Sequence, residues 1–84
     1  MKRFQMYRRD MSAAPHNAFQ KNPPDQVQFE GVEFSDGAVV IRWLTVCGST
    51  AVWKNMAEML LVHGHPEYGS ELVWMDEDHD KWSY

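Results

Sequence analysis

The residues with the clearest chemical potential are the imidazoles of His63 and His65, which flank Gly64. With the thiol of Cys47 and the imidazole of His79, they could offer nitrogen and sulfur ligands to zinc. Structural zinc sites, however, use paired ligands at spacings such as C-x₂₋₄-C or H-x₃₋₅-H, and the chain has neither. A structural role explains the same residues: His63 favours a helix C-terminus, Gly64 supplies a left-handed cap, and His65 fixes the loop by a hydrogen bond. We therefore expect no metal site.

Acidic residues at positions 76, 78 and 80 resemble the start of a calcium-binding loop, in which ligands alternate along the chain. Such a loop needs glycine at its sixth position for a sharp turn, and that position is Lys81. We therefore interpret residues 77–84 as an acidic, aromatic tail that could dock on a basic partner.

Cys47 and Ser49 are the candidate nucleophiles. Cys47 lies beside Gly48 in a predicted turn, and Ser49 lacks the G-x-S-x-G context of a nucleophile elbow. The spacing of the carboxylates places no pair for general acid–base work. We expect no catalytic residue, no cofactor and no enzymatic activity.

Basic and aromatic residues alternate near the N-terminus, a pattern that could bind single-stranded nucleic acid by stacking and phosphate contacts. A charged edge strand that resists aggregation would look the same. Aromatic residues beside charge are also frequent in protein interfaces. The candidate binding residues are Arg3, Tyr7, Arg8, Arg9, His65, Tyr68, Trp82 and Tyr84.

Length and composition limit the possible functions. The chain has 84 residues and a mass of 9.8 kDa, the size of a single small domain. Hydrophobic residues make up 44% of it, which is too high for a wholly disordered protein. The single cysteine excludes an intramolecular disulfide and fits a reducing compartment. Since no apolar stretch has the length of a signal peptide or membrane span, we expect a cytoplasmic protein without membrane contact.

Charge is divided unevenly along the chain. Residues 1–26 carry five basic and two acidic side chains, and residues 27–84 carry three basic and ten acidic ones, for a net charge of -4. An acidic body argues against duplex DNA as the main ligand, since binding DNA requires many contacts from basic residues to phosphates.

The N-terminal segment predicts a strand followed by a long loop. Residues 3–8 alternate apolar and polar side chains, as a strand with one buried face does. Residues 10–25 contain Pro15, Pro23 and Pro24 among small polar residues, a composition that suits neither a ladder nor a helix. We interpret residues 1–9 as an N-terminal strand or basic arm and residues 10–25 as a loop.

A hairpin is predicted around Asp36-Gly37, the preferred pair for a two-residue type I′ turn. The apolar phase of the preceding strand shifts by one residue at Gly31, as a β-bulge would cause. The resulting register places four pairs on one face: Phe34 opposite Val39, Val32 opposite Ile41, Phe29 opposite Trp43 and Val27 opposite Thr45. Glu30 would lie near Arg42 on the other face.

The remaining core elements follow from local patterns. Apolar residues on both faces of 38–46 predict a strand that is central or covered on both sides. A short strand is expected at 50–53 and a closing strand at 71–75. Asn55 followed by Glu58 resembles a capping box, and Met56, Met59, Leu60 and His63 form one face of a two-turn helix.

Several ordered segments together resemble a known group of proteins. They follow the pattern F-x-G-V-x-F-x-D-G … R-W … S-T-x-V-W … H-G-H over roughly residues 29–76. This pattern is similar to that of short uncharacterised proteins encoded by actinobacteria and their phages. The resemblance implies a phage or prophage accessory setting, in which small proteins often bind a host protein. It implies no catalytic residue, binding residue or cofactor.

The sequence thus predicts a single α+β domain over residues 1–84. Its core at 26–76 would be a strongly bent antiparallel sheet of about five strands, with one short helix before the last strand and partial closure into a barrel as an alternative. We expect a small non-enzymatic phage or prophage accessory protein that binds a host protein in the host cytoplasm. The alternatives are a nucleic-acid-associated module using the basic N-terminal arm and a self-associating structural component.

Overall fold

The computed structural model describes residues 1–12 and 22–76 of the chain. The predicted tail at 77–84, with Trp82 and Tyr84, and most of the predicted loop lie outside these residues. In order, the described elements are β1 (Lys2–Arg8), β2 (Val27–Glu33), β3 (Val39–Trp43), β4 (Thr50–Trp53), α1 (Met56–His63), the short 3-10 helix η2 (Pro66–Tyr68) and β5 (Ser70–Trp74).

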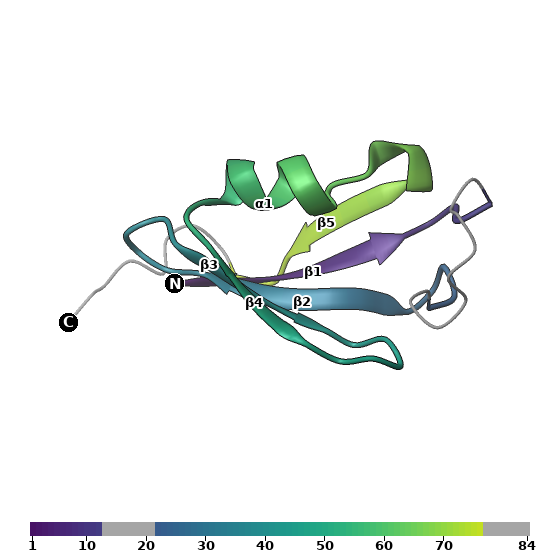
Figure 1. Cartoon of the computed structure of the whole chain (residues 1–84), viewed down its shortest axis with the longest axis horizontal. Helices are drawn as coiled ribbons and strands as arrows, with labels where there is room; N and C mark the ends of the chain where they lie inside the picture. Colours follow the sequence, from purple (N-terminus) through teal and green to yellow (C-terminus); the bar gives the residue numbers. More distant parts are fainter. Residues whose placement is uncertain (13–21, 77–84) are drawn as a thin grey trace.

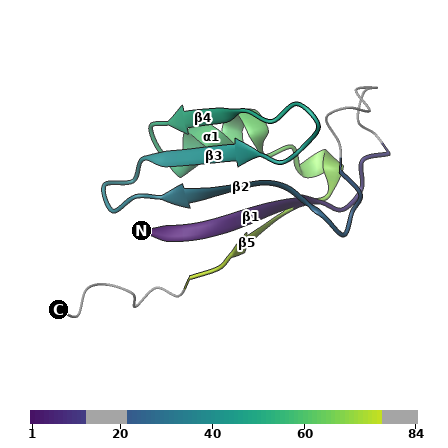
Figure 2. The same ribbon diagram turned by 90° about the horizontal axis from the view of Figure 1, so that it is seen from below.

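The five strands form one antiparallel sheet in the order β4-β3-β2-β1-β5, and α1 precedes the last strand. The predicted α+β class is therefore confirmed. The edge strands β4 and β5 do not pair with each other, so the sheet stays open and the barrel alternative is wrong. α1 lies on one face of the twisted sheet (Figure 1), and the five strands lie side by side (Figure 2).

β1 lies inside the sheet, between β2 and β5. It pairs with β2 over six residue pairs and with β5 over five, although β5 lies more than 60 residues further along the chain. The interpretation of this basic segment as a charged edge strand is therefore wrong. Its inward-facing residues Phe4, Met6 and Arg8 are all buried.

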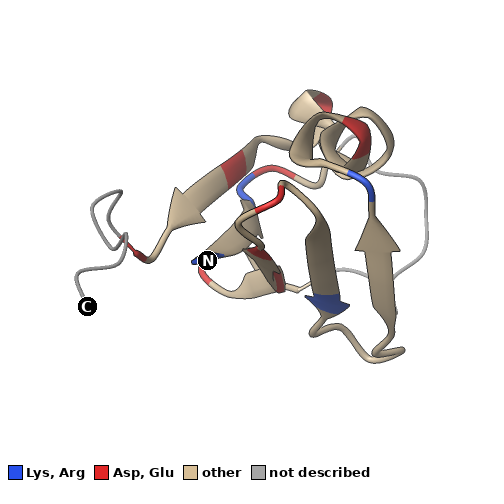
Figure 3. Cartoon of the chain, turned by 90° about the vertical axis from the view of Figure 1, so that its left-hand side faces the viewer, with Lys and Arg blue, Asp and Glu red and all other residues tan. Residues whose placement is uncertain are grey.

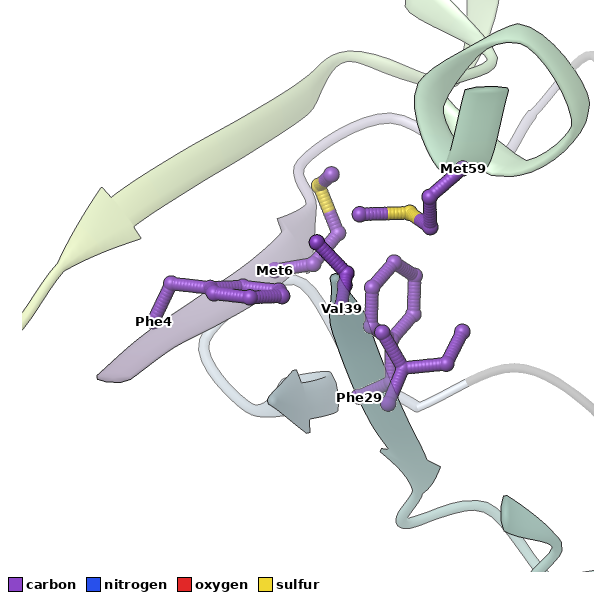
Figure 4. Close-up of a cluster of buried hydrophobic side chains, with 6 residues drawn as sticks. Phe4, Met6, Phe29, Val39 and Met59 are labelled. Carbon is purple, nitrogen blue, oxygen red and sulfur yellow. The ribbon is translucent and has the colours of Figure 1, made fainter. Parts of the chain in front are cut away.

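The hydrophobic core lies between the sheet and α1 (Figure 4). Each core side chain is at most 2% exposed, and burial of a side chain of this size contributes roughly 1.5–3 kcal/mol. A helix of eight residues is unstable alone, so α1 depends on the docking of its buried residue, Met59, against this core. The core residues are Phe4, Met6, Phe29, Val39, Ile41 and Met59.

Two predicted pairs of the β2–β3 hairpin are confirmed. Phe29 lies opposite Trp43, and Glu30 lies opposite Arg42. The rings of Phe29 and Trp43 are 4.6 Å apart between centroids, within the range of favourable aromatic pairs.

The bulge predicted at Gly31 is wrong. The ladder runs without interruption through Gly31, which lies opposite Ile41, and Val32 consequently pairs with Val40. Successive side chains of a strand point to opposite faces, so Val32 does not share the interior with Ile41. Phe34, also predicted to be interior, is 39% exposed.

The additional unpaired residue that was predicted at Gly31 lies in the turn between β2 and β3 instead. Phe34 N–H donates to the Ala38 carbonyl at 2.8 Å, and Gly37 N–H donates to the Phe34 carbonyl at 2.9 Å. Gly37 has a φ of 97°, which suits a type I turn followed by a glycine bulge. The loop therefore has three residues rather than two, and Glu33, not Phe34, lies opposite Val39.

Gly31 is required for close packing across the sheet. A Cβ atom at this position would lie 2.6 Å from Cζ of Phe4 and 2.4 Å from the Val40 carbonyl oxygen. The ring of Phe4 thus occupies the space that a side chain at residue 31 would need. This close approach of the Phe4 ring explains why a glycine occupies an inward-facing position in the middle of β2.

A bulge does occur in β2, but in its pairing with β1 rather than with β3. The register of β1 against β2 shifts between Met6 and Tyr7, which leaves Gln28 as the extra residue. Gln28 is 2% exposed, and its Oε1 accepts a hydrogen bond of 3.1 Å from Asn22 N–H. The bulge therefore anchors the described end of the preceding loop to the sheet.

α1 begins where the sequence predicts. The Asn55 side chain accepts a hydrogen bond of 2.8 Å from Glu58 N–H, as an N-cap does. The strand at Thr50–Trp53 is also confirmed, and the closing strand Ser70–Trp74 begins one residue earlier than predicted.

The end of α1 differs from the prediction. Gly64 keeps helical angles, with φ -69° and ψ -46°, and the left-handed conformation falls on His65, with φ 39° and ψ 68°. Gly64 is nonetheless needed, because a Cβ atom there would lie 2.4 Å from the Leu60 carbonyl oxygen. Histidine is among the residues enriched at positive φ, so the backbone reversal at His65 is unusual but accessible.

β3 is an inner strand, and among the described elements α1 covers one face of it. It ends at Trp43, and the apolar residues after it lie in the loop to β4, with Leu44 42% and Val46 78% exposed. Of the two predicted alternatives, a central strand or one covered on both sides, the first is confirmed, because β3 lies between β4 and β2. No described helix lies on the face of the sheet opposite α1 (Figure 1). We refer to this face as the open face.

Candidate functional site

The predicted binding residues do not form a single site. Those that the structure describes separate into three places, and Trp82 and Tyr84 lie outside the described residues. The three places hold Arg8 with His65 and Tyr68 on the helix-covered side, Tyr7 with Arg9 on the opposite face of β1, and Arg3 at the far end of β1.

Arg8 is a buried structural residue, 3% exposed. Its guanidinium donates hydrogen bonds of 2.8 Å to the His63 carbonyl and 3.0 Å to the Gly64 carbonyl, and a further bond to Ser70 Oγ. A cation at the last carbonyls of a helix is favourable for the helix dipole. Burial lowers the pKa of Arg8, while the nearby Tyr68 and Glu67 oppose this shift. The guanidinium thus binds groups of its own chain inside the molecule.

His63 lies among three aromatic rings of the sheet. Its ring centroid is 5.1 Å from that of Trp43, 5.5 Å from that of Trp53 and 6.4 Å from that of Phe29. Burial, and after it the positive charge of Arg8, lowers the pKa of this imidazole. His63 is therefore held in its neutral form, as a packing residue.

His65 and Tyr68 form an exposed stack on the loop between α1 and β5. Their rings are 4.7 Å apart with an interplanar angle of 15°. His65 Nδ1 lies 2.9 Å from Oε2 of Glu67, and this hydrogen bond lowers the pKa of the Glu67 carboxyl. The predicted hydrogen bond from His65 that fixes the loop is therefore confirmed.

Arg9 makes three contacts with its own chain. Its Nε lies 2.8 Å from Oε1 of Glu71, its Nη1 donates to the Pro24 carbonyl at 2.8 Å, and its guanidinium lies 4.0 Å from the Tyr7 ring centroid. Tyr7 and Glu71 are directly opposite each other in the β1–β5 ladder. These contacts fix the side chain of Arg9 beside the sheet.

Arg3 forms a bidentate ion pair with Asp76. Its Nη2 donates to Oδ1 at 2.8 Å and its Nε to Oδ2 at 3.0 Å, while its backbone N–H also donates to Oδ2 at 2.8 Å. These hydrogen bonds lower the pKa of Asp76 to about 2. The pair closes the end of the sheet where β1 begins and β5 ends.

The open face of the sheet carries a row of valines that sequence reasoning did not assign to a site. Val32 pairs with Val40, and Val40 pairs with Val52, so the three side chains lie in line across β2, β3 and β4. Val52 is 74% exposed, whereas Val32 and Val40 are half-buried. We refer to Val32, Val40 and Val52 as the valine row.

A shallow hollow adjoins the valine row, with a volume of about 360 Å³. Its apolar lining comes from Val32, Val40 and Met75, and its polar rim includes Arg3 and Arg42. Met75 is 46% exposed, so apolar surface extends across this face beyond the row itself. An apolar centre with a polar rim is the usual composition of a protein-binding patch.

The sequence of β3 indicates that its outer face is apolar. Val40 lies on the face opposite Val39 and Ile41, and its apolar character predicted a cover on that side. The described residues provide α1 for one face only. An apolar residue on a predicted outer face can therefore indicate an interaction surface as well as an internal contact.

Basic and acidic residues both occur at several separate places along the described part of the chain (Figure 3). Within residues 1–12 and 22–76, no group of three or more His, Cys, Asp or Glu side chains could hold a metal ion. In the same part of the chain, no helix has the length and apolar character needed to cross a membrane.

The sequence matches the Acb5 phage protein family over residues 27–76. This segment runs from Val27, the first residue of β2, to Asp76, the ion-pair partner of Arg3. No curated protein and no solved structure matches the chain. The matched segment excludes β1, although β1 is the strand that joins β2 to β5. The actinobacterial range and the motif pattern stay predictions. Because the match covers more than half of the chain, this small phage protein belongs to the Acb5 phage protein family.

Proposed function

We propose that this protein is a non-enzymatic phage accessory protein that acts in the host cytoplasm by binding a host protein. The observation that carries the proposal is the valine row on the open face, with its adjoining hollow. Contiguous apolar surface rimmed by polar residues marks interaction sites, since water solvates such a patch poorly. Membership of a phage protein family supports a role towards the host.

The charges around this face favour a partner with an apolar strip over one rich in phosphate. Arg3 is paired with Asp76, and Arg42 lies opposite Glu30 in the ladder. Arg9 is paired with Glu71. Nucleic-acid binding through the N-terminal segment would require Arg3 and Arg9 to exchange their carboxylate partners for phosphates, whereas a protein partner would not.

Capture of partners from host cells tests the proposal. Deleting residues 1–9 would remove β1 from the middle of the sheet, so point substitutions are needed. Val40→Lys places a charge in the centre of the valine row and should lower recovery of the captured protein by about tenfold, the usual effect of a central interface residue. Val62→Lys is the matched control, because Val62 is 48% exposed on α1.

The partner should be identified by chemical crosslinking of the full-length chain in host cells, followed by mass spectrometry. Both variants should keep the circular dichroism spectrum and melting behaviour of the parent chain. Recovery that is unchanged by Val40→Lys, or that disappears on nuclease treatment, would contradict the proposal.

A further inference from the structure

The two edges of the sheet differ in how they are protected. β5 carries Glu71 and ends at Trp74, over whose ring Lys2 Nζ lies at 4.4 Å. β4 has the sequence Thr-Ala-Val-Trp, without charge or proline, and pairs with β3 over four consecutive residues without a bulge. Edge strands are normally protected against pairing with another chain by charge, proline, a bulge or short length. Of these, β4 has only its short length of four residues.

Among the described strands, β4 pairs only with β3, and its other edge presents the backbone of alternate residues. Trp43 N–H donates to the Ser49 carbonyl at 2.8 Å, which marks this pair as hydrogen-bonded. Since bonded and non-bonded pairs alternate in an antiparallel ladder, the next bonded pair is Ile41 with Ala51. The N–H and C=O groups of Thr50 and Val52 therefore point away from β3, towards the open side of the sheet.

We propose that the chain forms a dimer through antiparallel pairing of β4 with β4 of a second copy. The two five-stranded sheets would then form one continuous sheet of ten strands, related by a two-fold axis at Val52. In this register Val52 exchanges both backbone hydrogen bonds with Val52 of the second copy, as its outward-pointing groups require. This inference rests on β4 and does not depend on the proposed host partner.

The side chains agree with this register on both faces. On the helix-covered face, the small Ala51 lies opposite Trp53 of the second copy. On the open face, the two copies of Val52 meet, so the two valine rows join into one apolar band. Thr50 lies opposite Lys54 of the second copy, and no like charges face each other. If the two-fold axis lay at Ala51 instead, the register would shift by two residues and Val52 would lie opposite Thr50 of the second copy. The two valine rows would then no longer join into one apolar band.

The second copy is the occupant that this edge fits best because the edge is self-complementary. A two-fold axis requires one surface to match itself, and β4 offers outward backbone groups on the residue at the axis. Pairing of four-residue strands buries little area, below that of a standard stable interface. The dimer should therefore be concentration-dependent, with a dissociation constant on the order of 1–100 µM.

Sedimentation equilibrium of the full chain tests the dimer. From about 1 µM to about 1 mM, the mass should rise from 9.8 kDa towards twice that value. Val52→Lys should keep the chain monomeric over the same range, because each copy would bring a charge to the axis. Val46→Lys is the matched control and should dimerise like the parent chain, since Val46 is 78% exposed in the neighbouring loop and Val52 is 74% exposed on the edge.

Crosslinking tests the register. In a Cys47→Ser background, which removes the exposed native thiol, Val52→Cys should give a covalent dimer with a short bismaleimide, and Val46→Cys should not. Equal melting temperatures of Val52→Lys and the parent at low concentration establish that the variant is folded. A parent chain that stays monomeric throughout, as it would if β4 served only a strand of another protein, overturns the proposal. A dimer that survives Val52→Lys, or that crosslinks equally through residue 46, overturns it as well.

Discussion

The guanidinium of Arg8 donates a hydrogen bond of 2.8 Å to the main-chain carbonyl of His63, and so ties the first strand to the last turn of α1. A second bond reaches the Gly64 carbonyl at 3.0 Å. These carbonyls are among those that a helix leaves without partners at its C-terminus. One buried cation therefore links the start of the chain to the helix that covers its core.

Replacing Arg8 should destabilise the protein strongly. Arg8→Met keeps much of the side-chain volume but leaves the two partly buried carbonyls without their charged donor, at a cost on the order of 3 kcal/mol. Arg9→Met should cost less than about 1 kcal/mol, because Arg9 lies in an exposed ion pair. Urea unfolding of both variants measures the difference. Equal losses of stability would show that Arg8 is not a structural cap.

Local signals in the sequence were sufficient for α1. The Asn55 cap, the apolar spacing from Met56 and the glycine at residue 64 act within a few residues of one another, and the helix has the predicted bounds. The turn at Asp36-Gly37 was also found, but its type was not. An Asp-Gly pair suits both a two-residue turn and a three-residue turn with a glycine bulge, and only the cross-strand pairing distinguishes them.

Contacts between distant segments could not be predicted from the sequence. The position of β1 depends on its pairing with β5, and no local pattern encodes which strands become neighbours. The buried position of Arg8, one of the candidate binding residues, could not be predicted for the same reason. Alternation places Arg8 on the inward face with Phe4 and Met6, but its acceptors come from the end of α1, more than 50 residues away.

Gly31→Ala should be poorly tolerated. Its Cβ atom would lie 2.4 Å from the Val40 carbonyl oxygen and 2.6 Å from the Phe4 ring, so the strands or the ring must move. Overpacking of this kind costs about 1–3 kcal/mol. Gly48→Ala is the control, because its nearest contacts would be at 3.3 Å and it should lose less stability. Thermal melting compares the two variants, and a Gly31→Ala chain as stable as Gly48→Ala would contradict the packing argument.

The ion pair of Arg3 and Asp76 predicts a loss of stability in strong acid. The pKa of Asp76 is about 2 in the folded chain, against an ordinary value of 3.8. Because the folded pKa is the lower one, the stabilisation is complete above pH 3.8 and disappears as the pH falls towards 2. Asp76→Asn should reduce stability at neutral pH and lose less on acidification than the parent. Asp25→Asn, at an exposed position, should behave like the parent in urea titrations at each pH.

His63 predicts a second pH dependence, at milder acidity. Burial and the charge of Arg8 lower its pKa in the folded chain below the ordinary value of 6.5. The unfolded chain therefore binds a proton more readily, and stability is complete above about pH 6.5 and decreases as the pH falls towards the folded pKa. The three aromatic rings around His63 do not compensate for the lost solvation of an imidazolium.

His63→Phe isolates this effect. A phenyl ring suits the contacts with Trp43, Trp53 and Phe29, so the variant should fold, and it cannot titrate. Between about pH 8 and about pH 5, the parent should lose more of its unfolding free energy than His63→Phe does. Leu61→Phe, at an 86% exposed position of the same helix, is the control for an added phenyl ring and should retain the parent's decrease. If the difference in unfolding free energy between the parent and His63→Phe is constant over this range, His63 is not desolvated in the folded protein. In that case α1 does not pack on the aromatic rings of Trp43, Trp53 and Phe29 as closely as the ring distances require.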